Sequence, residues 1–247
     1  EHRPLFDVTR GKMTYEDREE TLPKLAETVV RLMAHHPGEK GLIHCHSYDI
    51  QAALTERRGD RGVGPRVRRH DREDRDAQLS TWKRADDPEV FLSVKMEEAL
   101  DLEGDLARWQ VVCKAPFPNT RDSRVAHRLE AGQWDWYYRA ALRTVVQACG
   151  RIVRAPDDYG ATYLADASLL DLFERARRDV PDWFAAQVDR MQRPDLPPAS
   201  ATAALGATES SGRTRTPTGS RNGSPSSAEN GDRKQVEDHP LSDVWGE

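Results

Sequence analysis

The chain has 247 residues and a formal net charge of −5, and only seven of its 37 basic residues are lysine. This length allows one or two domains. No apolar run approaches a transmembrane helix or looks like a signal peptide, so we expect a cytoplasmic protein without a membrane partner. The three cysteines, Cys45, Cys113 and Cys149, form no C-x-x-C pair. Their spacing argues against a disulfide framework or a zinc site and favours buried free thiols.

Arginine outnumbers lysine while carboxylates are abundant. This composition resembles that of proteins from salt-loving archaea, whose carboxylates keep the surface hydrated, although codon usage in a high-GC genome would give the same arginine bias. The negative net charge does not exclude nucleic acid as a partner, because a local basic path matters more than the total charge.

The first elements in chain order are a helix and a strand. Residues 1–20 are polar and mixed, and we expect them to be a lead-in from a preceding segment. Apolar residues then recur at helical spacing as far as Met33, with Thr21 as the cap and Pro23 in the first turn. His35 and His36 end this helix. Neighbouring positions point apart on a helix, so solvated histidines are favoured over a metal pair.

Residues 42–46 form a short apolar run that predicts a buried strand, and Ser47 can cap a helix that begins near Tyr48. His44 and His46 lie on one side of the strand, where packing or hydrogen bonding is favoured over metal binding. Residues 57–76 hold eight arginines interleaved with acids, which is either a phosphate-tracking surface or a solvated loop.

Strands and helices continue to alternate through the rest of the chain. We expect strands around Val67 and over 90–94, 109–114 and 161–166, and helices from Asp71, over 140–149, from Leu169 and from Val180. A basic stripe at Arg121, Arg124 and Arg128 either faces DNA or is solvated. The aromatic residues between 134 and 138 could stack on bases, but packing against the sheet is favoured.

The most informative stretch joins the predicted helix that carries Gln147 to the last strand. Arg151 and Arg154 are three residues apart, and on a helix they would share a face, where two guanidinium groups repel each other unless an anion lies between them. Gly150 beside them allows close approach of a backbone or ligand. On spacing alone, a helix end with solvated arginines remains the alternative.

The alternation predicts an α/β fold, with a parallel sheet covered by helices on both faces. Ligands of such sheets bind at the carboxyl ends of the strands, and we expect the functional motifs there. From about residue 193 large apolar residues are scarce, which predicts a disordered tail. The predicted organisation is a lead-in over 1–20, one domain over 21–192 and a low-complexity tail over 193–247.

Three patterns together resemble a known family. The sequence Q-x-x-G-R-x-x-R from Gln147, followed by D-x-G from Asp158, is similar to motif VI of superfamily 2 helicases of the XPD/DinG branch. The strand followed by Ser47 and Tyr48 resembles motif IV. Residues 93–104 resemble motif V, except that Ala99 replaces the family glycine. The resemblance covers residues 20–190 and implies the second, C-terminal RecA-like domain of an ATP-dependent DNA helicase.

This resemblance assigns expected roles to individual residues. Arg151 and Arg154 would act as arginine fingers on the ATP γ-phosphate, with Gln147 orienting the same site. The resemblance implies nucleotide-site positions at Gly150, Asp101, Glu98 and Asp158. It implies nucleic-acid contacts at Ser47, Tyr48, Ser93 and Lys95.

The sequence lacks a G-x-x-x-x-G-K-[ST] phosphate loop and an acidic magnesium-binding box. The resemblance therefore implies that ATP with Mg²⁺ is bound mainly by an N-terminal RecA-like half, and that an iron–sulfur cluster could only belong to that half. The implied partners are this half and single-stranded or forked DNA. A non-catalytic nucleic-acid-binding or interaction module with the helicase fold is the alternative, favoured by Ala99, by Ser168 in place of a family arginine, and by the absent phosphate loop. An unrelated nucleotide-binding α/β protein is a weaker third hypothesis.

Overall fold

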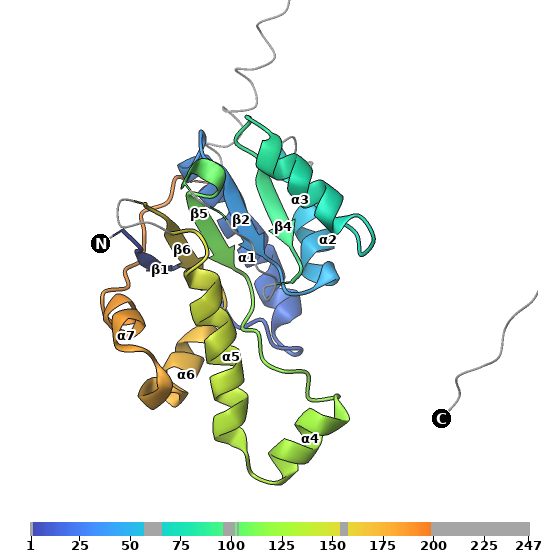
Figure 1. Ribbon diagram of the computed structural model, residues 1–247, viewed down its shortest axis with the longest axis vertical. Helices are drawn as coiled ribbons and strands as arrows, with labels where there is room; N and C mark the ends of the chain where they lie inside the picture. Colours follow the sequence, from blue (N-terminus) through green and yellow to red (C-terminus); the bar gives the residue numbers. More distant parts are fainter. Residues whose placement is uncertain (1, 57–65, 96–101, 103, 154–157, 199–247) are drawn as a thin grey trace, which may run out of the picture. The chain divides into compact units, whose positions relative to one another are not determined.

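The computed structural model describes residues 2–56, 66–95, 102, 104–153 and 158–198. Within these residues, six parallel strands form one sheet in the order β1-β6-β5-β2-β4-β3, as Figure 1 shows. The strands are β1 (Leu5–Asp7), β2 (Gly41–His44), β3 (Val67–Arg68), β4 (Val90–Ser93), β5 (Trp109–Val112) and β6 (Ala161–Leu164). The predicted parallel α/β sheet is therefore confirmed.

Helices cover both faces of the sheet because each strand buries side chains in both directions. The helices are α1 (Arg18–His35), α2 (Tyr48–Glu56), α3 (Arg75–Arg84), α4 (Ser123–Glu130), α5 (Trp134–Cys149), α6 (Ser168–Arg175) and α7 (Asp182–Asp189), with short 3₁₀ turns at Gly104–Leu106 and Arg177–Asp179. Within the described residues, none of these helices is long and apolar enough to cross a membrane.

Three apolar clusters hold the layers together. One lies between the sheet and α1 with α2, and contains Val29, Met33, Ile43 and Trp109. The other two lie on the opposite face. The larger joins β5 and β6 to α5, α6 and α7, and the smaller joins β2 and β4 to α3 and to Ile152. The smaller cluster fixes the stretch that follows α5 against the sheet.

The first strand was not predicted. Residues 5–7 lie in the predicted lead-in, yet they pair in parallel with β6, where Leu5 faces Thr162. The predicted start of α1 at Thr21 is also wrong, because the helix begins at Arg18 and Thr21 is buried inside it. A turn upstream sets this earlier start: the backbone N–H of Asp17 donates to the hydroxyl of Thr14 at 3.2 Å.

His36 corrects a second expectation. Its side chain is not solvated but buried, with Nε2 lying 2.7 Å from the hydroxyl of Tyr163 and its ring stacked on Trp109 at 5.1 Å. Burial lowers the pKa of His36, and the nearby Glu39 carboxylate opposes this shift. The histidine therefore joins α1 to the sheet, as part of the core.

Residues that follow residue 192 also pack against the domain. Leu196 is buried in the first cluster, and the guanidinium of Arg31 donates to the carbonyls of Leu196 and Pro197, both at 2.8 Å. Residues 193–198 thus belong to the packed domain, so for them the predicted disorder is wrong. The rest of the predicted tail lies outside the described residues.

Candidate nucleotide and nucleic-acid interface

The stretch that resembles motif VI begins at the end of α5. Gln147 is exposed on the last turn, and Gly150 ends the helix with its N–H donating to the carbonyl of Val146 at 3.1 Å. Gly150 has a helical φ of −81°, and a Cβ placed there would meet two carbonyl oxygens at an ordinary 3.6 Å. The fold of the described residues therefore does not require glycine at this position, and a ligand approach at Gly150 stays a prediction.

Gly160 differs from Gly150, because the space that a Cβ would need there is already occupied. A Cβ at Gly160 would lie 2.5 Å from Cδ1 of Ile152 and 3.2 Å from its carbonyl oxygen. Glycine at residue 160 is thus a packing requirement that brings the stretch after α5 onto the sheet.

Arg151 lies directly after the α5 cap. The residue is half-buried, its backbone N–H donates to the carbonyl of Ala148 at 3.0 Å, and its Nε is buried without a hydrogen-bond partner among the described residues. A buried guanidinium N–H without an acceptor is costly, because it has lost its water and gained nothing in exchange. This orphaned donor marks a place where an anionic oxygen would be stabilised. Arg154 lies outside the described residues.

A buried polar row crosses the sheet beneath Arg151. The side-chain nitrogen of Gln110 donates to the hydroxyl of Thr162 at 2.8 Å and to the carbonyl of Ala148 in α5 at 3.1 Å. The Gln110 amide oxygen therefore faces His44, whose Nε2 lies 3.0 Å away and must be the donor. This tautomer leaves Nδ1 of His44 as an acceptor, and that atom is buried without a partner among the described residues.

The environment of His44 keeps the imidazole neutral. Burial lowers the pKa of His44 to about 4, with the positive fields of His46 and Arg151 adding to the effect and the Gln110 hydrogen bond opposing it. His44 was predicted to pack or form hydrogen bonds, and this is confirmed. The link to Gln110 and Arg151 was not predicted, because those residues come from distant parts of the sequence.

Asp158 lies near the amino ends of the strands, whereas the functional motifs were expected at the carboxyl ends. Its carboxylate pairs with Arg108 at 2.8 Å, and Arg108 directly precedes the first residue of β5. Arg3, which precedes β1, donates to the carbonyl of Val153 at 3.1 Å. Val153 and Asp158 therefore lie near the amino ends of the strands, since α5 must return there before β6 can run parallel. A nucleotide contact by Asp158 stays a prediction.

The loops that resemble motifs IV and V meet at the carboxyl ends of β2 and β4. Ser47 caps α2 as predicted, its hydroxyl accepting from the N–H of Ile50 at 3.2 Å. Cys45, just before it, donates its N–H to the carbonyl of Ser93 at 2.8 Å. Ser93 is fully buried and its hydroxyl donates to the carbonyl of Lys95 at 2.9 Å, which favours a role in shaping the loop. Lys95 is exposed, and the predicted nucleic-acid contacts stay predictions.

His70 joins these loops and gave no functional signal in the sequence. Its Nδ1 donates to the carbonyl of Asp71 at 2.8 Å, so Nε2 is the acceptor for the N–H of Val94 at 3.3 Å. Tyr48 lies edge-on to the His70 ring at 6.1 Å, and the guanidinium of Arg72 lies 5.5 Å from the Tyr48 ring centroid. Arg72 is exposed, so the Tyr48 ring and the Arg72 cation meet near the carboxyl end of β2.

Two arginines of the charged stretch serve neither of the predicted purposes. Arg66 donates to the carbonyls of Pro88, Met33, His36 and Glu39, at 2.8 to 3.1 Å. Arg68 forms a two-pronged ion pair with Glu89 at 2.7 and 2.8 Å. Both are structural residues that fix the edge strand β3.

Asp166 is a structural residue at the carboxyl end of β6. The carboxylate is buried and accepts three backbone N–H groups, from Met13 at 3.0 Å, Ala115 at 2.8 Å and Ser168 at 2.9 Å. It thereby ties together the loop before α1, the exit from β5 and the start of α6. Cys45 directly follows β2 and Cys113 directly follows β5, and the hydrogen bond between their thiols together with burial raises the pKa of the Cys113 thiol.

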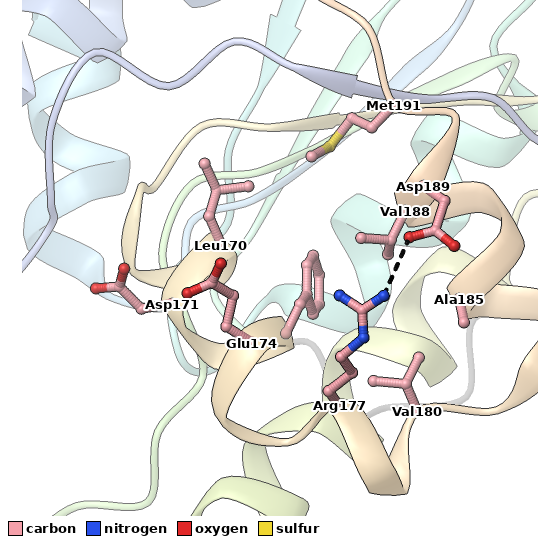
Figure 2. Close-up of a pocket in the computed structure, with 10 residues that line it drawn as sticks. Leu170, Asp171, Glu174, Arg177, Val180, Ala185, Val188, Asp189 and Met191 are labelled. Atoms are coloured by element: carbon pink, nitrogen blue, oxygen red, sulfur yellow. Dashed lines mark ion pairs between the residues drawn. The ribbon is translucent and has the colours of Figure 1, made fainter.

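A separate apolar cavity lies between α6 and α7, as Figure 2 shows. It measures about 350 Å³ and is lined by Phe173, Val180 and Val188, with Arg177 and Asp189 at a distance of 4.0 Å on its rim. None of the predicted site residues lines it.

Among the described residues, no three histidine, cysteine or acidic side chains gather as metal ligands. Glu98 and Asp101 lie outside the described residues.

The parallel sheet, the arginine that follows the glycine cap of α5, and the loops at the carboxyl ends of the strands are features of a RecA-like domain. Residues 29–187 match the family described as the helicase C-terminal domain. The match covers more than half of the chain, so the chain belongs to this family. It is the second RecA-like domain of the XPD/DinG type of superfamily 2 helicases.

Relatives and solved structures agree with this assignment. Human regulator of telomere elongation helicase 1 is 33% identical over 117 residues, which make up 40% of this chain and 9% of that protein. Its Culex quinquefasciatus homologue is 29% identical over 125 residues, 44% of this chain and 12% of that protein. The chain therefore spans about a tenth of the length of these relatives. The structure of S. tokodaii Xpd4 aligns with a TM-score of 0.55 at 16% identity, covering 78% of this chain and 38% of that one, which shows the shared fold.

Proposed function

We propose that this chain is the C-terminal motor half of an ATP-dependent DNA helicase. In this proposal, ATP with Mg²⁺ binds between this domain and an N-terminal RecA-like half that carries the phosphate loop. Arg151 and Arg154 meet the charge that develops on the γ-phosphate, and Gln147 orients the same site. Gly150 allows the nucleotide to approach, and Glu98 and Asp101 belong to the loop that couples nucleotide to DNA.

One observation carries the proposal. The Nε of Arg151 is buried and has no acceptor among the described residues. The neighbouring His44 has a pKa lowered to about 4 and is therefore neutral at physiological pH, so it adds no second positive charge near the guanidinium. An oxygen of a phosphate group supplies the missing acceptor and the compensating charge. Arginine suits this role better than lysine because its planar fork can bind two phosphate oxygens at once.

The DNA part of the proposal rests on the carboxyl edge of the sheet. Two adjacent loops there carry Ser47, Tyr48, Ser93 and Lys95. In this proposal Ser47 and Ser93 organise the backbone, and Tyr48 and Lys95 contact a strand of DNA. A single strand crossing both motor halves would be moved as ATP hydrolysis opens and closes the cleft between them.

The test joins the chain to the N-terminal half of an XPD-type helicase and measures DNA-stimulated ATP hydrolysis. Arg151→Ala is expected to lower kcat by about a thousandfold or more, as loss of an arginine finger does. Arg143→Ala is the matched control, because Arg143 is an exposed arginine on α5, the helix that precedes Arg151. Turnover in Arg151→Ala close to that of the control would refute the finger role.

The alternative is a non-catalytic nucleic-acid-binding or interaction module. Ser168 favours it, because a small side chain stands at the family's arginine position and its backbone N–H is already bonded to Asp166 at 2.9 Å. Measurements of DNA binding and ATP hydrolysis on the same joined protein distinguish the motor half from the non-catalytic module. DNA binding with no ATP hydrolysis in the unmutated protein would support the module, whereas DNA-stimulated hydrolysis excludes it.

A further inference from the structure

Gln110 is a buried polar residue in a strand that is otherwise apolar. It is fully buried, and the other residues of β5 are Trp109, Val111 and Val112. The backbone of β5 pairs with β2 on one side and with β6 on the other, so the sheet does not need the side-chain amide. A buried amide has a free-energy cost unless it is hydrogen-bonded, and an apolar side chain of the same shape avoids that cost. The contacts of the amide therefore indicate why a glutamine stands here.

The Gln110 amide and the backbone of Arg151 share one acceptor. Nε2 of Gln110 donates to the carbonyl oxygen of Ala148 at 3.1 Å, and the backbone N–H of Arg151 donates to the same oxygen at 3.0 Å. Ala148 lies in the last turn of α5, where carbonyl groups have no partner further along the helix. Gln110 thus fixes the end of α5 to the middle of the sheet, at the same carbonyl that holds the backbone of Arg151.

The neighbouring strands hold the Gln110 amide in one orientation. Nε2 also donates to the hydroxyl of Thr162 in β6 at 2.8 Å, and Oε1 lies 3.0 Å from Nε2 of His44 in β2. All three side chains are buried. Turning the amide over would place its oxygen against the carbonyl oxygen of Ala148, and two acceptors repel each other. The donor that Gln110 offers to Ala148 therefore has a fixed position.

The guanidinium of Arg151 depends on this anchor. Its Nε is buried without a hydrogen-bond partner among the described residues, so at that atom the position of the group follows from the backbone from which it projects. We propose that Gln110 is a positioning residue for Arg151 and acts through the carbonyl of Ala148. This role rests on the proposed function, because an arginine finger must already be in place when charge develops on the γ-phosphate. A displacement of about 1 Å can cost about a hundredfold in rate.

The first experiment measures amide hydrogen exchange by NMR in the full chain. Gln110→Met removes the donor and keeps an unbranched side chain of similar length. The Arg151 N–H is expected to exchange about tenfold faster, because the loss of one hydrogen bond loosens the last turn of α5. The N–H of Ala176, which caps α6 by donating to the carbonyl of Leu172 at 2.9 Å, is the reference within the same molecule and should keep its rate. An unchanged Arg151 rate, or equal acceleration of both N–H groups, would overturn the proposal.

Gln51→Met is the matched control. Gln51 is also a buried glutamine, and its Nε2 holds α2 to the sheet by donating to the carbonyl of Leu92 at 3.1 Å. The same substitution there should leave the exchange rate of Arg151 unchanged relative to that of Ala176. If Gln110→Met does not fold, because it leaves the His44 N–H without an acceptor, the double variant His44→Phe/Gln110→Met removes that donor as well and carries the same expectation.

The second experiment measures DNA-stimulated ATP hydrolysis by the joined protein. Gln110→Met is expected to lower kcat by about ten- to a hundredfold without changing the KM for ATP, since a finger acts mainly in the transition state. Gln51→Met should keep the kcat of the unmutated protein. In the Arg151→Ala background, Gln110→Met should have no further effect, because both changes remove the same interaction. Losses that add independently would count against a role through Arg151.

The two experiments distinguish failure of this role from failure of the proposed function. If Arg151→Ala lowers kcat and Gln110→Met does not, the finger role stands and Gln110 has no part in it. If Arg151→Ala retains the turnover of Arg143→Ala, the finger role fails. Selective loosening of the Arg151 N–H would then still identify Gln110 as the anchor of this residue.

Discussion

Lowering the pH from 7 to 5 is expected to destabilise the chain through His44. The folded state holds the pKa of His44 at about 4, against an ordinary value of 6.5. The unfolded chain therefore takes up a proton in this range while the folded chain does not. The stabilising contribution is complete above about pH 6.5 and is lost as the pH falls toward 4. The full effect of this shift is about 3 kcal/mol, of which about 2 kcal/mol falls between pH 7 and pH 5.

His44→Phe isolates this contribution. At pH 7 the variant should be less stable by about 1–3 kcal/mol, because the Gln110 amide oxygen loses its donor. That gap should narrow by about 2 kcal/mol at pH 5, since phenylalanine does not titrate. Urea denaturation followed by circular dichroism measures both gaps. His36, whose pKa is also lowered, is present in both proteins and cancels. Parallel loss of stability in the two proteins would refute the buried neutral histidine.

Three further substitutions test the site and its frame. Gly150→Ala should leave the free energy of unfolding within about 1 kcal/mol of the unmutated value, yet lower ATP turnover in the joined protein if a nucleotide approaches there. Gly160→Ala should lose about 1–3 kcal/mol in urea denaturation, because the new methyl group has no space. Asp166→Ala should cost about 3 kcal/mol or more, since it leaves three backbone N–H groups without their acceptor, whereas the exposed Glu174→Ala should change stability little. An equal loss of stability in Gly150→Ala and Gly160→Ala would contradict the packing described for Gly160. An equal loss in Asp166→Ala and Glu174→Ala would contradict the three hydrogen bonds assigned to Asp166.

The helices and central strands were predictable because their signals are local. Residues 42–46 form a short, mostly apolar run that is typical of a buried strand, and Ser47 caps α2 through a bond that spans three residues. The long helix α5 has an apolar face that repeats along its length. These patterns, and the three helicase motifs in order, specify the α/β fold and the family.

Elements that depend on distant partners were missed. β1 has only three residues, and it is a strand because β6 offers it a free edge, which no pattern within residues 5–7 announces. The edge at which Asp158 lies was mispredicted for a related reason. The resemblance grouped Asp158 with the motifs expected at the carboxyl ends of the strands, but its carboxylate pairs with Arg108, which directly precedes β5.

The sequence by itself determined the alternation of strands and helices and the order of the motifs, because periodicity and capping act over a few residues. Only the tertiary structure decided that His36 is buried, that His44, Gln110 and Thr162 form one polar row, and that Arg151 has a buried Nε without an acceptor. Burial and the pairing of polar groups depend on which strands become neighbours. In a parallel sheet of the order found here those neighbours lie far apart in the chain, so no local pattern specifies them.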